Sequence, residues 1–215
     1  FESAFNMDSL ETIMVDTRNP YIDSRNNCNA VIETQKNKLL WGCKNSFIPD
    51  GVRRIVDLSH LPIDSIVIPS SVELISGNAF LECDKLAYIE FQEPDSILEI
   101  GSGAFKGCTS LKELVFPNKI QFVDNPDIIS FYGNDYEHFM NCTNLKTVTL
   151  PSTMRIIPKK MFYGCTSLTT VNFPDGLTGI GENAFFGCPL DTIRIPASVV
   201  KIDEAAFMGC AATAK

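Results

Sequence analysis

The stretch Leu168-Thr-Thr-Val171-Asn-Phe173-Pro174-Asp-Gly-Leu177-Thr-Gly-Ile180-Gly-Glu-Asn-Ala184-Phe185-Phe-Gly-Cys188 contains every part of a unit that recurs along this chain of 215 residues. Its most regular part is Phe-x-x-Cys, which occurs six times, with successive cysteines 22 to 25 residues apart except for one interval of 34. The pairs are Phe80 and Cys83, Phe105 and Cys108, Phe139 and Cys142, Phe162 and Cys165, Phe185 and Cys188, and Phe207 and Cys210. Self-similarity at a fixed period of this length indicates a stacked repeat protein.

A second recurring piece has the form Leu-x-x-Ile-x-Phe-Pro, with other aliphatic residues at some positions. Its copies begin at Leu10, Ile63, Leu86, Leu111, Leu145, Leu168 and Leu190. Alternation of apolar and polar residues is typical of a short strand, and proline ends the strand because it donates no ladder hydrogen bond. The Ala-Phe-x-x-Cys piece, preceded by Gly, Ser, Asn or Glu, is expected to form about one helical turn.

Stacking of the units decides the fold. A unit of about 23 residues cannot bury its own apolar face, whereas stacked copies can, with each copy contacting only its neighbours. We therefore predict one β-rich α/β domain over residues 1–215, a solenoid with a parallel strand ladder and short helical turns. The six phenylalanines and six cysteines above are expected to form inward columns as its structural core, beside columns of Leu and Ile/Val.

The combined pattern Ile-Pro-x-x-Val-x-x-Ile-x-x-x-Ala-Phe-x-x-Cys-x-x-Leu-x-x-Ile-x-Phe resembles the BspA-like leucine-rich repeat family of bacterial surface proteins. The segments Tyr21 to Thr34 and Leu39 to Pro49 also resemble an insert seen in those proteins. The resemblance covers nearly the whole chain and implies a right-handed leucine-rich-repeat solenoid that is secreted or attached to the cell surface. It further implies that some relatives bind host matrix proteins or other cells, and that they share no catalytic residues.

The first interruption of the repeat, at about residues 20–48, predicts a β-hairpin insert. A turn centred after residue 35 pairs Glu33 with Lys38 and places Cys28 opposite Cys43. These two cysteines are therefore the best candidates for a disulfide in this chain. The hairpin either packs the single tryptophan over a coil or binds a ligand, and packing is the usual role of such an aromatic residue.

The second interruption, at about residues 120–138, accounts for the long interval between cysteines. Its aromatic and acidic residues suit a binding surface, and the alternative is a satellite cluster that covers the convex side of a coil. Asp124, Asp127 and Asp135 match no calcium-loop spacing, so no metal site and no cofactor are predicted.

The remaining cysteines and histidines give no catalytic constellation. No Cys-x-x-Cys pair is present, which argues against zinc, and the column cysteines are expected to pack as free thiols. His60 and His138 are about three coils apart, and His138 lies beside Phe139 at a position that alanine holds in other copies. We therefore predict that the protein is not an enzyme, with a glycan hydrolase using two converging carboxylates as the minor alternative.

The composition excludes several classes of partner. There are 18 Lys and Arg against 26 Asp and Glu, for a net charge of -8, which argues against nucleic acid because phosphate binding needs a basic face. The sequence has no run of 18 apolar residues, so no membrane insertion of this segment is predicted.

Outward strand positions form two columns that make a candidate binding face. One column holds Thr12, Ser65, Tyr88, Glu113, Thr147, Thr170 and Thr192, and the other holds Met14, Val67, Glu90, Val115, Thr149, Asn172 and Arg194. The predicted binding residues are Tyr88, Glu90, Glu113, Thr147, Thr170, Asn172, Thr192 and Arg194 on this face, with Phe131, Tyr132 and Tyr136 in the second interruption. The alternative is that threonine recurs only because it suits an exposed strand.

These observations predict a non-enzymatic, extracellular or cell-surface interaction module. It would act like an adhesin and bind a host or microbial protein or glycan. The alternative is a structural spacer that displays another domain. The sequence begins and ends within a repeat, so we expect it to be part of a longer protein.

Overall fold

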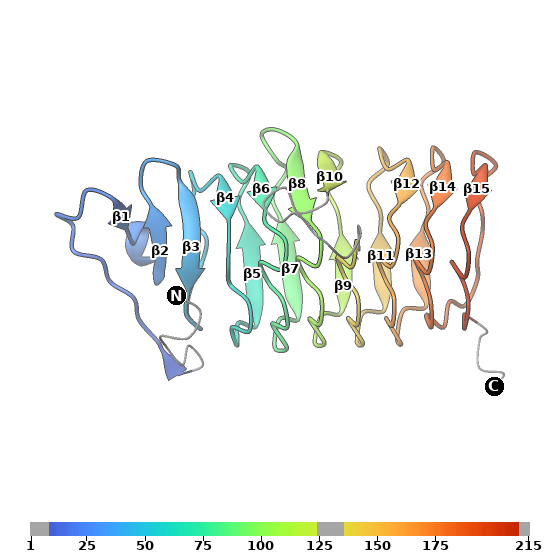
Figure 1. The fold of residues 1–215 in the computed structure, drawn as a ribbon, viewed down its shortest axis with the longest axis horizontal. Helices are drawn as coiled ribbons and strands as arrows, with labels where there is room; N and C mark the ends of the chain where they lie inside the picture. Colours follow the sequence, from blue (N-terminus) through green and yellow to red (C-terminus); the bar gives the residue numbers. More distant parts are fainter. Residues whose placement is uncertain (1–8, 124–135, 211–215) are drawn as a thin grey trace.

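The chain winds into a β-solenoid whose coils follow one another along a single long axis, as Figure 1 shows. The computed structural model describes residues 9–123 and 136–210. A hairpin lies at one end of the solenoid and the coil that contains β15 at the other. The parallel solenoid predicted from the repeat is confirmed.

Each regular coil contributes one strand to each of two ladders, seen in Figure 1 as a lower and an upper row of arrows. The first ladder holds β5 (Ser65–Ile68), β7 (Tyr88–Phe91), β9 (Glu113–Val115), β11 (Thr147–Thr149) and β13 (Thr170–Asn172). The second ladder holds β3 (Lys38–Gly42), β4 (Arg54–Ile55), β6 (Leu74–Ile75), β8 (Leu98–Gly101), β10 (Ile120–Val123), β12 (Ile156–Ile157), β14 (Gly179–Ile180) and β15 (Lys201–Ile202). All pairs between these strands are parallel.

The core is a set of columns in which each repeat position stacks on its copy in the next coil. The rings of consecutive column phenylalanines lie nearly parallel, with centroids 4.9 Å apart for Phe80 and Phe105 and 5.4 Å apart for Phe185 and Phe207. The column cysteines are all buried, and so are the phenylalanines except Phe207, which is half-buried in the last described coil. A repeat of fixed length therefore brings like side chains together and excludes water from the axis.

The Ala-Phe-x-x-Cys segments are successive tight turns, and the helical turns predicted there are absent from the described residues. The described residues form no α-helix, and the 3-10 helix η2 (Arg25–Asn27) lies in the hairpin insert. In or directly before five of the six segments, two residues four apart have positive φ, such as Asn78 and Glu82 or Gly103 and Gly107, and left-handed residues interrupt an α-helix.

The backbone of these turns bonds to the next coil as well as within each turn, where for example Cys83 donates its N–H to Phe80 at 3.3 Å. Phe80 donates its N–H to the carbonyl of Ala104 at 2.8 Å, and Phe162 donates to Ala184 at 2.9 Å. The turns therefore form a further set of hydrogen bonds along the solenoid, in addition to the bonds within each turn.

The hairpin insert is present, but its register differs from the prediction. β2 (Ala30–Glu33) pairs antiparallel with β1 (Ile22–Asp23) and with β3, and Glu33 pairs with Lys38 as predicted. A β-bulge follows, because Val31 pairs with Trp41 and Ile32 with Leu39, which leaves Leu40 as the extra residue.

The bulge separates the two cysteines that the sequence predicted to face each other. Ala30 pairs with Gly42, so Cys28 is not opposite Cys43, and both thiols are free and buried. Cys28 lies in the main core, whereas Cys43 packs in a small cluster with Ile13 and Val31. The predicted pairing was wrong because one extra residue moves all later side chains to the opposite face of a strand.

Candidate binding surfaces

The outer face of the first ladder carries the two predicted columns in register. Ser65 pairs with Tyr88, and Thr147 lies between Glu113 and Thr170. In the second column Val67 pairs with Glu90, and Thr149 lies between Val115 and Asn172. These side chains are all exposed, whereas the residues that alternate with them point to the core. We call this outer surface of β5, β7, β9, β11 and β13 the strand face.

The strand face has two regions of different chemistry. Val67, Tyr88 and Val115 lie at its β5–β9 end, with 42%, 50% and 61% of their surfaces exposed, and the acidic residues Glu90 and Glu113 lie among them. The β11–β13 end presents Thr and Asn side chains and no charge from its strand positions. The β5–β9 end therefore offers the apolar and aromatic contacts that contribute most to protein interfaces.

Lys112 belongs to this region, although the sequence reasoning did not include it. Its Nζ donates a hydrogen bond to the Tyr88 hydroxyl at 2.9 Å and lies 4.8 Å from the centre of the Tyr88 ring. Its backbone N–H bonds to Ala87 at 3.3 Å, which connects consecutive coils. The sequence feature that could have identified Lys112 is its position directly before the outward-facing Glu113, one repeat after Ala87.

Thr192 and Arg194 are exposed, but the strand predicted there is absent from the described residues. The segment from 191 to 195 is linked to the preceding coil by the hydrogen bond from Asp191 N–H to Thr169, 3.0 Å. Ile193 and Ile195 are 38% and 40% exposed there. The segment predicted as a strand from Leu10 is also not a strand, although Ile13 is buried.

Tyr136 lies away from the strand face, and Phe131 and Tyr132 lie outside the described residues. Tyr136 is half-buried beside the second ladder, with its ring 6.1 Å from that of His138. The structure therefore does not bring Tyr136 together with the strand-face residues.

His138 is a packed residue, as its position beside Phe139 in the repeat indicated. Its ring is fully buried and meets Phe122 edge-on at 5.0 Å. Nδ1 lies 2.8 Å from the carbonyl of Tyr136, and Nε2 lies 3.2 Å from that of Ile100. Burial lowers the pKa of His138 to about 4, because the charged ring is deprived of water.

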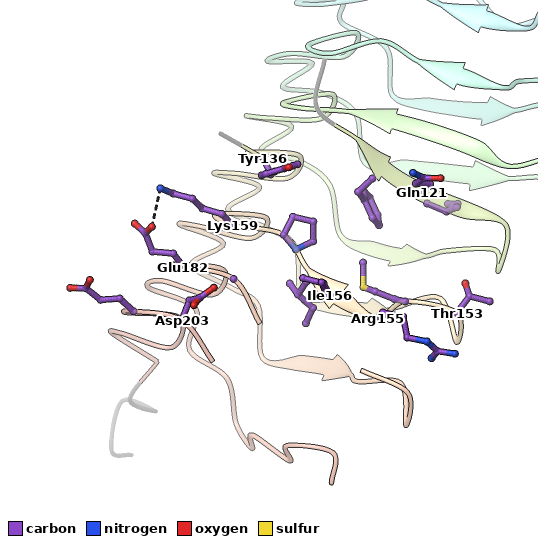
Figure 2. Close-up of a pocket in the computed structure, with 15 residues that line it drawn as sticks. Gln121, Tyr136, Thr153, Arg155, Ile156, Lys159, Glu182 and Asp203 are labelled. Carbon is purple, nitrogen blue, oxygen red and sulfur yellow. Dashed lines mark ion pairs between the residues drawn. The ribbon is translucent and has the colours of Figure 1, made fainter. Parts of the chain in front are cut away.

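A groove that the sequence did not predict opens beside the second ladder, between β10 and β12 (Figure 2). Its volume is about 770 Å³. The two strands belong to consecutive coils, yet each is the last strand of its own sheet in the described residues. Elsewhere the two coils stay in contact, since β9 pairs with β11 and the rings of Phe105 and Phe139 are 5.3 Å apart.

Pro158 gives a chemical reason for this interruption. In other coils the residue directly after the second-ladder strand donates its N–H to the preceding coil, as Ser76 does to Ile55 and Gly181 does to Ile157, both at 2.9 Å. The register of β12 and β14 places Pro158 at the position of Gly181. Proline has no N–H to donate, so one rung of the ladder is lost where the groove begins.

Charged side chains gather at one end of the groove. Lys159 pairs with Glu182 at 3.0 Å, and Asp203 pairs with Lys201 at 2.8 Å. Glu204, which follows Asp203 in the chain, also lines the groove, and Figure 2 shows Lys159, Glu182 and Asp203 away from Arg155 and Thr153. Within the described residues, no group of three or more histidine, cysteine or acidic side chains is placed to hold a metal ion.

Two parallel ladders around columns of Leu, Ile, Phe and Cys define the class of the protein as a leucine-rich-repeat β-solenoid. The model of the BspA-type leucine-rich repeat region matches residues 43–128 and 134–215, in six copies. The chain belongs to this BspA-type leucine-rich repeat family, as its repeat pattern indicated.

Solved structures of bacterial proteins share this fold. A leucine-rich cell-surface protein from Faecalibacterium prausnitzii is 27% identical, with a TM-score of 0.66, over 96% of this chain and 54% of that protein. A leucine-rich repeat protein from Eubacterium ventriosum is 19% identical, with a TM-score of 0.55, over 94% of this chain and 53% of that protein. The pneumococcal vaccine antigen PcpA is 18% identical, with a TM-score of 0.54, over 93% of this chain and 47% of that protein.

The chain therefore spans about half the length of each of these structures. No curated protein sequence matches it. Among the described residues, none of the helical structure is long and apolar enough to cross a bilayer.

Proposed function

We propose that this chain is a non-enzymatic, adhesin-like interaction module of a bacterial surface protein, and that it binds a partner protein through the strand face. The observation that carries the proposal is the alignment of exposed side chains across β5 to β13 in two straight columns. Extended sheet surfaces of repeat proteins are suited to large partners, because each coil adds contacts of the same kind.

The β5–β9 end of the strand face is the proposed centre of the contact. Tyr88 combines an apolar ring with a hydroxyl, and Lys112 holds it by a hydrogen bond and a cation–π contact. A side chain held in this way loses little conformational entropy on binding. Val67 and Val115 extend the apolar area, and Glu90 and Glu113 supply charge for recognition.

The chemistry of the buried groups supports a role without catalysis. Burial raises the pKa of the Cys83 thiol to about 12, so this thiol stays protonated and unreactive. His138 is buried and neutral, and it contacts backbone carbonyls rather than a nucleophile. The likeness to a cell-surface protein of Faecalibacterium prausnitzii supports a surface location.

Binding to arrays of matrix proteins and glycans, with the purified chain as the probe, tests the proposal. We expect binding to at least one protein on the array, and a loss of about tenfold or more in affinity for Tyr88→Ala. Ile97→Ala is the matched control, because Ile97 is 57% exposed but lies before β8 in the second ladder. Binding to glycans alone would favour a glycan partner, and equal binding by both variants, or none by either, would favour the structural spacer.

A further inference from the structure

We propose that the groove between β10 and β12 is a second binding site, which takes an extended, basic peptide segment of a partner protein by strand addition. The proposal does not depend on the strand face. It rests on two edge strands that face a common groove and on the charge at one end of that groove.

The backbone groups that face the groove follow from the register. Glu99, the register partner of Gln121, donates its N–H to Glu73 of the preceding coil at 2.9 Å. Gln121 therefore directs its backbone toward β8, and Ile120 and Phe122, on either side of it, direct theirs toward the groove. Both of these residues line the groove.

The opposite wall is formed by β12 in the same way. Gly179 and Gly181 of the following coil donate to the carbonyls of Arg155 and Ile157, at 3.2 and 2.9 Å. These two residues face β14, so the backbone of Ile156 faces the groove. Each wall of the groove therefore offers an exposed strand edge, and strand addition pairs an extended peptide with such an edge.

The size and surface of the groove suit such a segment. Its volume of about 770 Å³ lies within the range of roughly 300–1,000 Å³ of small-molecule pockets. Ile156 is 62% exposed there, which gives an apolar contact for alternate side chains of an added strand.

Charge selects the kind of peptide. Glu182, Asp203 and Lys159 lie at one end, away from Arg155 (Figure 2), and Glu204, the residue after Asp203, also lines the groove. Glu182 and Asp203 are already paired with Lys159 and Lys201, so Glu204 is the carboxylate that a Lys or Arg of the bound segment would pair with. We therefore assign the site to a segment of alternating polar and β-branched residues with a basic residue at that end.

Fluorescence anisotropy with labelled synthetic peptides tests the proposal. The probes are capped Thr-Val repeats that end in two lysines, the same repeats ending in two glutamates, and the lysine peptide with N-methyl groups on alternate residues. We expect only the unmethylated lysine peptide to bind below about 1 mM, because N-methylation removes the donors that strand addition needs. Equal binding of the methylated peptide, or none by any peptide at that concentration, would overturn the proposal.

Single-site variants place the binding in the groove. We expect Ile156→Cys, after attachment of a bulky maleimide, to lose at least about tenfold in affinity for the lysine peptide. Ile97→Cys with the same reagent should bind normally, since Ile97 is similarly exposed outside the groove. The native cysteines are buried, so the reagent reaches the introduced thiol.

A charge-reversal pair separates local from overall electrostatics. Glu204→Lys should weaken binding of the lysine peptide, and Glu93→Lys, an equal change in net charge outside the groove, should leave it unchanged. Tyr88→Ala should also bind the peptide normally, so failure of the strand-face proposal can be told apart from failure of this one. Equal loss in Glu204→Lys and Glu93→Lys would show attraction by net charge alone.

Discussion

The thiol of Cys108 donates a hydrogen bond to the backbone carbonyl of Phe80, 3.2 Å away and one coil earlier. The other cysteines of the column do the same in their coils, at 3.0 to 3.3 Å. The Phe80 carbonyl oxygen also accepts the N–H of Cys83 at 3.3 Å. The Cys108 thiol therefore bonds to the second lone pair of this oxygen. The column cysteines are therefore donors along the solenoid axis as well as small apolar side chains.

Substitution of Cys108 separates these two roles. If the thiol acts as a donor, Cys108→Ala should lower the free energy of unfolding by about 1–3 kcal/mol, and Cys108→Ser, which keeps a donor, by less. If the column were only apolar packing, the order would be reversed, because a buried hydroxyl costs free energy. Urea denaturation followed by circular dichroism measures both values.

Alkaline pH should destabilise the protein through the same column. Burial raises the pKa of Cys83 from 9.0 to about 12 and that of Cys210 to about 11. The unfolded chain therefore releases thiol protons at a lower pH than the folded chain, so stability is complete below pH 9 and falls as pH rises toward 12. Thermal melts at pH 7.5 and 10 measure the loss.

A chemical probe checks this interpretation of the alkaline loss. Iodoacetamide at pH 8 should modify no column cysteine in the folded protein and all of them in urea, as judged by mass spectrometry. The Cys83→Ala variant should lose less stability between pH 7.5 and 10 than the wild type does. An identical loss in both proteins would assign the pH dependence to other groups.

The columns of the solenoid could be predicted from the sequence because the repeat length is nearly constant. Once one copy of Phe, Cys and Leu is placed inside, all equivalent copies must follow, as Phe105, Cys108 and Leu111 do. The exposed columns of the strand face follow from the same argument, because side chains alternate along a strand.

The features that the sequence did not predict, namely the bulge, the non-helical turns and the groove, depend on single residues outside the repeat pattern. The bulge at Leu40 was hidden because Lys38-Leu-Leu-Trp41 has apolar residues that fit either register. The sequence predicts helical turns because Glu82 and Lys160 carry no sequence sign of the positive φ that they adopt. The groove depended on Pro158, whose missing N–H matters only in the context of neighbouring coils.

Close approach of coils should make Gly101 intolerant of alanine. An added Cβ would lie 2.5 Å from the backbone N of Gly77, which is fixed in the preceding coil. We expect Gly101→Ala to cost about 3 kcal/mol or more of stability. Gly187 is the matched comparison, because its φ is +74° but nothing lies within 4 Å of an added Cβ, so Gly187→Ala should cost only about 1–2 kcal/mol. Equal costs, measured by urea denaturation, would contradict the role assigned to the coil contact.

Acid should destabilise the protein through His138. Burial lowers the pKa of His138 from 6.5 to about 4, so between these values the unfolded chain binds a proton that the folded chain does not. The free energy of unfolding should therefore be complete above pH 6.5 and fall as pH drops toward 4, by up to about 3 kcal/mol from this one group. Denaturant unfolding at pH 7 and at pH 4.5 measures this difference.

The repeat supplies the controls for His138, because other coils carry Ala or Met at its position, as at Ala104 and Met161. His138→Met should reduce the loss of stability between pH 7 and 4.5, whatever its effect at pH 7, because it removes the titrating ring. His60→Ala should keep the full loss, since the His60 side chain is 59% exposed and lies 3.5 Å from Glu82 at the surface. If His138→Met retained the pH dependence of the wild type, the acid sensitivity would come from carboxylates such as Asp23, whose pKa is lowered to about 2 by its hydrogen bonds to Arg25.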